Sequence, residues 1–280
     1  MSARIAGHPA ARTRHYPQIL TNRFRYNHVM THLTTIEPVD YLAIGHITRD
    51  LTPEGEIPGG TVYYSAMTAH ALGLRVGIVT ACDSHFPLPK MDGITILPQF
   101  SEETTTFENI YHSGERSQII HTIASSLNLS SIPETWRTTP LVHIAPVARE
   151  VDPSLARFFS NSFVGVTPQG YLREWNQKGE VTLGEWPETS FVLENSDAAV
   201  ISIEDVNHEE SRVEEMLRSI RVLAVTEGQD GASVYWNGDV RHFSPPRVTE
   251  IEPTGAGDIF AACFFSRLQT TRDPWEACRF

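Results

Sequence analysis

The segment Pro253–Phe265, PTGAGDIFAACFF, places two glycines and an aspartate where an apolar helix should begin. Gly255 and Gly257 allow backbone conformations that turn consecutive N–H groups into one concavity. The helix that follows adds its positive N-terminal end. Such a site suits a phosphate, or negative charge that develops in a transition state. Asp258 could accept a proton from an attacking hydroxyl or could simply cap the helix, and this segment alone leaves both readings open.

Two other glycine-containing turns could border a ligand. The segment TEGQDGASVYWNG (226–238) has a turn at Thr226 and Gly228 and a second strand after Gly231, which by itself indicates only a β-hairpin connection. The pair Gly59-Gly60 precedes the helical pattern TVYYSAMTAHALG. A tight turn explains that pair, and so does close approach of a ligand to the backbone. The glycine-rich segment at 255–257 is not a Walker loop, because the Gly-Lys-Ser/Thr ending is missing.

Short apolar strands that end at polar loops recur along the chain and must position these turns. Helical patterns lie between several of them, which implies parallel crossover connections. The pattern predicts a doubly wound α/β domain that binds ligands at the carboxyl ends of its strands. From Thr104, TTTFENIYHSGERSQIIHTIA is interrupted by the turn HSGE and predicts an antiparallel hairpin outside the core sheet. The core strands are expected in YLAIG, RVGIVTAC, LVHIAPV (141–147), FVGVTPQG (163–170), DAAVISIED (197–205) and RVLAVT.

Composition bounds the class of function. With 280 residues, 40% of them hydrophobic and 20% charged, the chain has the make-up of a soluble globular protein. No run approaches the roughly 18 apolar residues of a membrane span, and the formal net charge of −12 disfavours a nucleic-acid partner. The three scattered cysteines lack metal-site spacing and indicate free thiols in a reducing cytoplasm.

Both ends of the chain differ from its middle. Residues 1–36 hold five arginines, four histidines and no acid, a composition found in transit peptides. The segment lacks an amphipathic apolar stripe, so we expect residues 1–37 to be a disordered extension or an upstream start, with Met30 as the natural beginning. At the other end, Asp273 and Pro274 predict the start of a last helix. Either that short helix closes the fold or the chain is truncated.

Taken jointly, the order and content of these segments resemble the ribokinase-like (phosphofructokinase-B type) carbohydrate kinase family over roughly residues 40–280. The late signature of that family appears as Glu252-Pro253-Thr254-Gly255-Ala256-Gly257-Asp258, and the early one as Gly59-Gly60. The resemblance implies a three-layer αβα fold with a doubly wound, mostly parallel sheet. It assigns residues 38–280 to one kinase domain, with a small β-lid from segments at about 51–58 and 104–122.

The resemblance also implies a set of site residues. Asp258 would be the base that deprotonates the acceptor hydroxyl. The N–H groups of Gly255, Ala256 and Gly257 would form an anion hole for the γ-phosphoryl group. ATP would be the donor, with Mg²⁺ bridging its phosphates. Further implied positions are Thr226, Gly228, Gly231 and Thr254 beside the nucleotide, and Asp50, Gly59 and Gly60 beside the sugar.

Two departures from the family concern the metal. Glu252 stands where the family usually has Asp. The Asn-x-x-Glu motif that organises Mg²⁺ lacks a close counterpart: its place falls on Ser202–Asp205, while a literal match, Asn207–Glu210, lies five residues later. We expect Glu204, Asp205 and Glu252 to serve the metal. An acid pair at a helix N-terminus would explain the first two equally well.

A narrower resemblance, to the inositol kinase-like branch, rests on TTTFENIYHSGERSQ, HIAPVAREV and TPQGYLREW. It implies that Asn109 and Arg116 of the lid face a sugar or cyclic polyol, although Arg116 could be a solvated hairpin residue. Gln169, Arg173 and the buried-type His143 could be structural. The function expected is phosphorylation of a polyol hydroxyl. The alternatives are a nucleoside kinase of the same fold and a catalytically weak sugar- or nucleotide-binding protein, and a homodimer through the lid is one assembly that the resemblance allows.

Overall fold

A computed structural model describes residues 36–53, 55–112, 115–248 and 254–280; the side chains of 111–116 are not described. Nearly all of the predicted N-terminal extension therefore lies outside the described residues. Within them, the core is a nine-stranded sheet in which seven neighbouring strands are parallel and two antiparallel strands close one edge. The strands are, in spatial order, β15 (Asp239–Phe243), β14 (Ala232–Trp236), β13 (Val222–Thr226), β12 (Ala198–Ser202), β9 (Phe163–Val166), β8 (Leu141–Ile144), β1 (Tyr41–Ile44), β4 (Val76–Cys82) and β5 (Ile94–Phe100).

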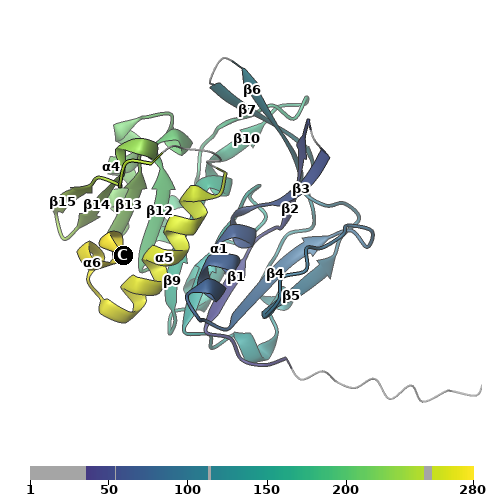
Figure 1. Ribbon diagram of the computed structural model, residues 1–280, viewed down its shortest axis with the longest axis horizontal. Helices are drawn as coiled ribbons and strands as arrows, with labels where there is room; N and C mark the ends of the chain where they lie inside the picture. Colours follow the sequence, from purple (N-terminus) through teal and green to yellow (C-terminus); the bar gives the residue numbers. More distant parts are fainter. Residues whose placement is uncertain (1–35, 54, 113–114, 249–253) are drawn as a thin grey trace, which may run out of the picture. The chain divides into compact units, whose positions relative to one another are not determined.

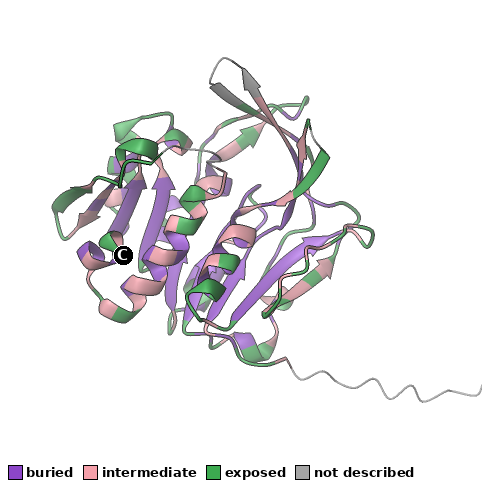
Figure 2. Cartoon of the chain, in the orientation of Figure 1, coloured by how far each residue is buried: buried purple, intermediate pink, exposed green. Residues whose placement is uncertain are grey.

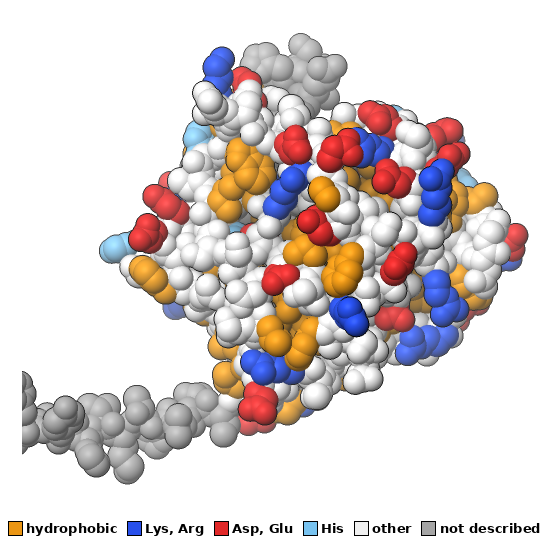
Figure 3. All heavy atoms as spheres, turned by 180° about the vertical axis from the view of Figure 1, so that it is seen from behind, with side chains coloured by type: hydrophobic (Ala, Val, Ile, Leu, Met, Phe, Trp, Pro, Cys, Tyr) orange, Lys and Arg blue, Asp and Glu red, His pale blue; other side chains and the backbone are white. Residues whose placement is uncertain are grey.

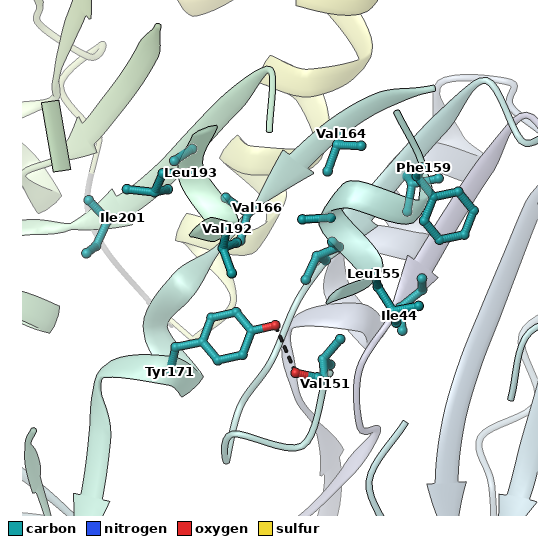
Figure 4. Packing of buried hydrophobic residues seen from close by; sticks show 14 of the residues in the cluster. Ile44, Val151, Leu155, Phe159, Val164, Val166, Tyr171, Val192, Leu193 and Ile201 are labelled. Atoms are coloured by element: carbon teal, nitrogen blue, oxygen red, sulfur yellow. Dashed lines mark hydrogen bonds between the residues drawn. The ribbon is translucent and has the colours of Figure 1, made fainter. Parts of the chain in front are cut away.

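The central strands are apolar because helices cover both faces of the sheet. Every residue of β1, β4, β8 and β9 is buried, as expected for parallel strands enclosed on both sides (Figure 2). Figure 1 shows α1 and α5 side by side over one face. One apolar cluster contains residues from α1 (Thr61–Ala71), α5 (Ala256–Thr271) and α6 (Pro274–Arg279). A second, seen in Figure 4, contains residues from α2 (Ser154–Phe158), α3 (Thr189–Glu194) and α4 (Glu210–Leu217).

A separate four-stranded sheet stands at the carboxyl end of β1, in the order β3 (Gly55–Gly59), β2 (Thr48–Thr52), β6 (Thr106–His112) and β7 (Glu115–Thr122). The two predicted lid segments thus belong to one sheet, labelled at the top right of Figure 1. A hairpin of β10 (Arg173–Trp175) and β11 (Val181–Leu183) adjoins its far edge. There the Ile120 N–H donates to the Gly179 carbonyl at 2.8 Å.

The sequence-based elements agree with this architecture, with differences at the edges of the sheet. The edge strands β5 and β15 and the hairpin β10–β11 were not predicted, because their partly or fully exposed residues lack a continuous apolar run. The predicted last helix is confirmed as α6, where the Asp273 side chain accepts from the Trp275 and Glu276 N–H groups. Short 3₁₀ turns occupy Leu129–Ser131, Glu134–Trp136, Pro168–Leu172, Ile203–Val206 and Gly228–Asp230.

The described part of the chain contains no helix of the length and apolarity that a membrane span requires. On the face turned toward the reader in Figure 3, acidic and basic side chains are interspersed and form no continuous basic band. Cys82, Cys263 and Cys278 are all free thiols.

Candidate active site

The order of the core sheet creates a crevice between β1 and β8. From β1 the chain builds β4 and β5 on one side, then crosses to β8 and continues through β9, β12 and β13 on the other. Loops at the carboxyl ends of two such strands diverge, which is where doubly wound sheets bind ligands. The buried carboxylate of Glu150 ties the two loops together, accepting from the N–H groups of His46 (3.1 Å), Val147 (3.0 Å) and Ala148 (2.7 Å). The sequence reasoning missed Glu150, whose only signal is an acid after an apolar strand.

Asp50 is brought against Gly59, the first residue of the glycine pair. It belongs to β2, opposite Ile57 of β3, and its side chain is buried. A Cβ added to Gly59 would lie 2.3 Å from the Asp50 Oδ2, so only glycine leaves room for the carboxylate. Gly60 has φ of 89° and begins α1, and a Cβ there would lie 2.3 Å from the His46 carbonyl oxygen. Asp50 and Gly59 therefore face each other across β2 and β3 of the lid sheet, and Gly60 follows directly at the start of α1.

The N-terminus of α5 packs beside the first turns of α1. Gly255 is its N-cap residue, with φ of 80°, and a Cβ there would lie 2.5 Å from the Tyr64 ring. The Ser65 hydroxyl donates to the Asp258 carbonyl at 3.3 Å. Asp258 is in the first turn of the helix, and Gly255 occupies the N-cap position. Ala256 and Gly257 are exposed, and a Cβ added to Gly257 would meet no atom of the described residues within 4 Å.

The start of α1 lies between the two segments of the expected site. Asp50 lies against Gly59, the last residue of β3, two residues before α1 begins. The Ser65 hydroxyl, in the second turn of α1, donates to the Asp258 backbone carbonyl. The start of α1 therefore links the segment that carries Asp50 to the first turn of α5.

A second polar group lies at the carboxyl ends of β12 and β13. Ser202 and Thr226 are directly paired across these strands. The Asp205 carboxylate accepts from the Ser202 N–H at 3.1 Å and from the Gln169 Nε2 at 2.6 Å. Burial raises the pKa of Asp205 above its usual range, against the opposing effect of the Gln169 hydrogen bond. Glu204 is exposed.

Asp205 has the chemistry of a magnesium ligand. No cluster of three or more His, Cys, Asp or Glu side chains that could hold a metal is found among the described residues. Mg²⁺ is commonly held by one or two carboxylates together with substrate phosphates and water. A carboxylate has about four lone-pair sites, so the two hydrogen bonds to Asp205 leave oxygen sites for water or a cation. Glu252, the third expected metal residue, lies outside the described residues.

The two glycines of the Thr226–Gly231 turn differ in their surroundings. A Cβ at Gly231 would lie 2.1 Å from the Phe243 carbonyl oxygen, so this glycine is required by the pairing of β14 with β15. Gly228 has φ of 57°, and a Cβ there would meet no atom within 4 Å. Thr226 also donates to the Ile201 carbonyl at 3.4 Å. Both glycines of this turn have a positive φ, but of the two it is Gly228 that has space beside it, among the described residues, for a ligand.

On the lid, Asn109 lies on the same face as Asp50. Asp50 pairs in parallel with Phe107, and Asn109 follows two residues later on β6. The Asn109 Oδ1 accepts from the Gln118 Nε2 at 2.7 Å. Arg116 pairs with Tyr111 near the tip of the hairpin, and its side chain lies outside the described residues. Thr254 is partly buried directly before the α5 N-cap.

A buried polar chain runs behind the site. The Tyr41 hydroxyl and the His143 Nδ1 are 2.7 Å apart, and the His143 Nε2 lies 3.0 Å from the Thr167 hydroxyl. Complete burial lowers the pKa of His143 to about 3, so this histidine is neutral and hydrogen-bonded within the core, as expected. Burial raises the pKa of Tyr41 strongly, and the charge of Asp258 adds to that shift.

Comparisons with known proteins agree with this geometry. Residues 186–280 match the model of the pfkB family carbohydrate kinase. A cytidine kinase of Thermococcus kodakarensis is 27% identical over 262 residues, which cover 86% of this chain and 92% of the relative. An inositol 3-kinase of Zea mays is 46% identical over 46 residues, 16% of this chain and 12% of the relative.

Among solved structures, one match is a pyrophosphate-dependent kinase in the ribokinase family complexed with a pyrophosphate analog and myo-inositol. Its TM-score is 0.71 at 20% identity, over 85% of this chain and 90% of that one. At this identity the likeness shows the fold, which is the ribokinase-like three-layer αβα architecture expected from the sequence.

Proposed function

We propose that the chain is a kinase of the pfkB family of carbohydrate kinases, whose model matches residues 186–280, and that it transfers a phosphoryl group from ATP to a hydroxyl of a sugar or cyclic polyol. One observation carries the proposal. Asp50 lies against Gly59, just before α1 begins, and Ser65 of α1 donates to the Asp258 carbonyl in the first turn of α5. These segments would supply a carboxylate that binds the acceptor, a base and an anion site.

In this mechanism, Asp258 accepts the proton of the acceptor hydroxyl as the hydroxyl oxygen attacks the γ-phosphorus. The new O–P bond forms while the bond to the bridging oxygen of the nucleotide breaks, and ADP leaves. The N–H groups of Gly255, Ala256 and Gly257 stabilise the charge on the transferring phosphoryl group, together with the positive end of α5. Asp50 binds another hydroxyl of the acceptor and sets its orientation.

The donor nucleotide would lie at the carboxyl ends of β12 and β13. Thr226, Gly228 and Thr254 would border it, whereas Gly231 supports the turn. In reactions of this class, Mg²⁺ neutralises part of the negative charge on the phosphates. Asp205 and Glu204 are the described side chains that would hold the ion, in part through water.

The inositol-like acceptor is favoured by the local likeness to an inositol 3-kinase and by the polar inner face of the lid. The likeness to a cytidine kinase over most of the chain supports a nucleoside as the alternative acceptor. A protein that binds sugar or nucleotide with weak catalysis is the alternative from another class. Free thiols and the absence of a basic band on the described face in Figure 3 are in keeping with a cytoplasmic enzyme of small molecules.

A donor and acceptor screen tests the proposal. Consumption of ATP, and of pyrophosphate for comparison, is measured with myo-inositol, hexoses, ribose and nucleosides. We expect one acceptor class to be phosphorylated, and Asp258→Asn to lower kcat by about 10²–10⁴-fold with little change in acceptor affinity. Unchanged turnover in Asp258→Asn would eliminate the base assignment. Acceptor binding with no donor consumption would favour the binding-protein alternative.

A further inference from the structure

One buried histidine ties the lid hairpin to the core. The hairpin of β6 and β7 leaves the core at Thr105, directly before β6, and returns to it at Ser125, three residues after β7. We call these two residues the feet of the hairpin. His46, in the turn after β1, is completely buried. Its Nδ1 lies 2.7 Å from the Thr105 Oγ1, and its Nε2 lies 3.0 Å from the Ser125 carbonyl oxygen. A single imidazole thus joins the end of β1 to both feet.

The two contacts determine how the imidazole is bonded. A backbone carbonyl can only accept, so the His46 Nε2 carries the hydrogen and donates to Ser125. Burial lowers the pKa of His46 below its usual range, so the ring is neutral and its Nδ1 is an acceptor. The Thr105 hydroxyl must therefore donate to Nδ1, while its oxygen accepts from the Ala124 N–H at 2.9 Å. The Thr105 hydroxyl is thus required in both of its hydrogen-bonding roles.

The Glu150 carboxylate holds the backbone that carries this imidazole. Its Oε1 accepts from the N–H groups of His46 (3.1 Å) and Val147 (3.0 Å), and its Oε2 from those of Val147 (3.0 Å) and Ala148 (2.7 Å). Each oxygen therefore accepts from two N–H groups. An amide in place of the carboxylate would turn its own amino group, which can only donate, toward N–H groups. Glu150 thus fixes the turn after β1 against the loop after β8.

We propose that Glu150, acting through His46, fixes both feet of the lid hairpin to the crevice and so sets the position of the lid over a bound acceptor. The inference rests on the proposed function and deepens it. The crevice between β1 and β8 is the place where the sheet order reverses, and doubly wound sheets bind ligands at such a point. Glu150, His46 and Thr105 are positioning residues, which act without touching the substrate.

A lid fixed in this way has two consequences for the reaction. It keeps the acceptor oriented for attack on the donor, and it keeps water away from the donor. Release of either foot should therefore impair phosphorylation of the acceptor and allow hydrolysis of ATP. A residue that contributes only to folding would change the stability of the protein without changing the ratio of these two reactions.

The test uses substitutions that keep side-chain shape and remove one interaction. Thr105→Val deletes the hydroxyl between His46 and Ala124, and Thr105→Ser keeps it. Glu150→Gln replaces the carboxylate with an amide, and the double variant combines this change with Thr105→Val. Thr139→Val is the matched control, because Thr139 is buried and donates to the Trp136 carbonyl at 2.8 Å, before the amino end of β8. The measurements are kcat and KM for ATP and for the best acceptor of the screen, and the ratio of ADP formed to acceptor phosphorylated.

We expect Thr105→Val and Glu150→Gln each to lower kcat/KM for the acceptor by about 10- to 100-fold. Both should leave the KM of ATP unchanged and raise the ratio of ADP to phosphorylated acceptor. Thr105→Ser and Thr139→Val should keep the wild-type ratio. The double variant should lose little more than either single variant, because both changes act through His46. A wild-type ratio in Thr105→Val and Glu150→Gln, or independent losses that add in the double variant, would overturn the assignment while the kinase function stands.

Hydrogen exchange tests the same connection without turnover. The reporter is the Ala124 N–H, which donates to Thr105, and the reference is the Thr167 N–H, which donates to the Ile144 carbonyl in the core at 3.1 Å. We expect Glu150→Gln to speed exchange at Ala124 by about 10-fold relative to Thr167, and Thr139→Val to leave this ratio unchanged.

The exchange result separates the two proposals. If the wild type phosphorylates no acceptor, the proposed function fails, and exchange at Ala124 alone decides whether Glu150 acts on the feet of the hairpin. Faster relative exchange there in Glu150→Gln would support the connection. Exchange equal to that of the wild type would contradict it.

Discussion

At the scale of single residues, side-chain size and charge explain why one residue type, and not another, stands at particular positions. Gly59 is glycine because the carboxylate of Asp50 occupies the space where its Cβ would be, with only 2.3 Å between them. Glu150 is an acid because three backbone N–H groups of two loops converge on it. The backbone N–H groups around Glu150, and the Thr48 hydroxyl that donates to Asp50 at 2.7 Å, replace hydrogen bonds that these carboxylates lose when they are buried away from water.

The buried histidine predicts how stability depends on pH. The folded protein holds the pKa of His143 at about 3, against about 6.5 in an unfolded chain. Between these values the unfolded chain binds the proton and the folded protein does not, so stability falls as pH drops below about 6.5. From pH 7.5 to pH 5 the loss due to His143 is about 2 kcal/mol in the free energy of unfolding.

Urea denaturation at the two pH values measures this loss in the wild type and in His143→Gln. The variant should lose less stability on acidification, whereas His85→Gln, which alters a 94% exposed side chain, should behave like the wild type. His46 is also buried with a lowered pKa, so part of the acid sensitivity should persist in His143→Gln. The same acid-induced loss in both variants would show that His143 does not contribute.

At the scale of elements, the packing of α5 against α1 positions the groups that we propose to be catalytic. Gly255 lets the chain enter α5 in a left-handed conformation directly beside the Tyr64 ring, and Ser65 holds the first turn through the Asp258 carbonyl. Gly257, two residues further on, is exposed, and a Cβ there would meet no atom of the described residues within 4 Å. The two glycines of one motif therefore serve different purposes, one in packing and one at the open site.

Replacing each of these glycines with alanine separates the two purposes. Gly255→Ala should lower the free energy of unfolding by about 1–3 kcal/mol, because it combines an unfavourable φ with a clash against Tyr64. Gly257→Ala should raise that free energy by roughly 0.5–1 kcal/mol, since alanine favours the helix. It should nevertheless reduce kcat by about 100-fold, because the methyl group displaces the phosphoryl group from its site.

Thermal or urea unfolding and steady-state kinetics on the same two preparations check these expectations. Each variant acts as the control for the other. A Gly257→Ala protein that is more stable and fully active would refute the placement of the phosphoryl group over the α5 N-terminus.

At the scale of the whole molecule, the lid sheet has one edge strand that no described strand covers. Strand β7 adjoins the β10–β11 hairpin, whereas β3 is the outer strand at the other side. Gly55, Glu56 and Ile57 of β3 are exposed, Ile57 by 45%. An exposed edge with an apolar side chain is a template for pairing with a second strand, which supports the expectation of a homodimer through the lid.

The dimer can be tested by sedimentation. The wild type is expected to sediment as a dimer, and Ile57→Asp as a monomer, because the charge would be buried in the interface. Phe100→Asp is the control: Phe100 lies 70% exposed on β5, the edge strand of the core sheet, and its replacement should leave the dimer intact. A monomeric wild type, or a dimer that Ile57→Asp leaves unchanged, would rule out the lid interface.

The sequence alone determined the fold class, the main core strands, the hairpin outside the core sheet and the glycine-rich helix start, because each of these depends on a local pattern. Alternating apolar strands and helices can be recognised from neighbouring residues in the sequence, and so can a glycine pair before a helix. The same reasoning could not find β5, β15 or β10–β11, whose half-exposed residues become strands only because a neighbouring strand supplies their hydrogen bonds.

Only the tertiary structure decided how the recognised segments act together. It placed Asp50 on Gly59, set Gly255 against Tyr64, made Gly231 a packing glycine and moved the N-cap from Asp258 to Gly255. It also joined Arg173 to Asn109 through Gln118, across 64 positions of sequence between the outer two. These relations depend on which strands are neighbours, and hydrogen bonds between residues far apart in the chain leave no local pattern in the sequence.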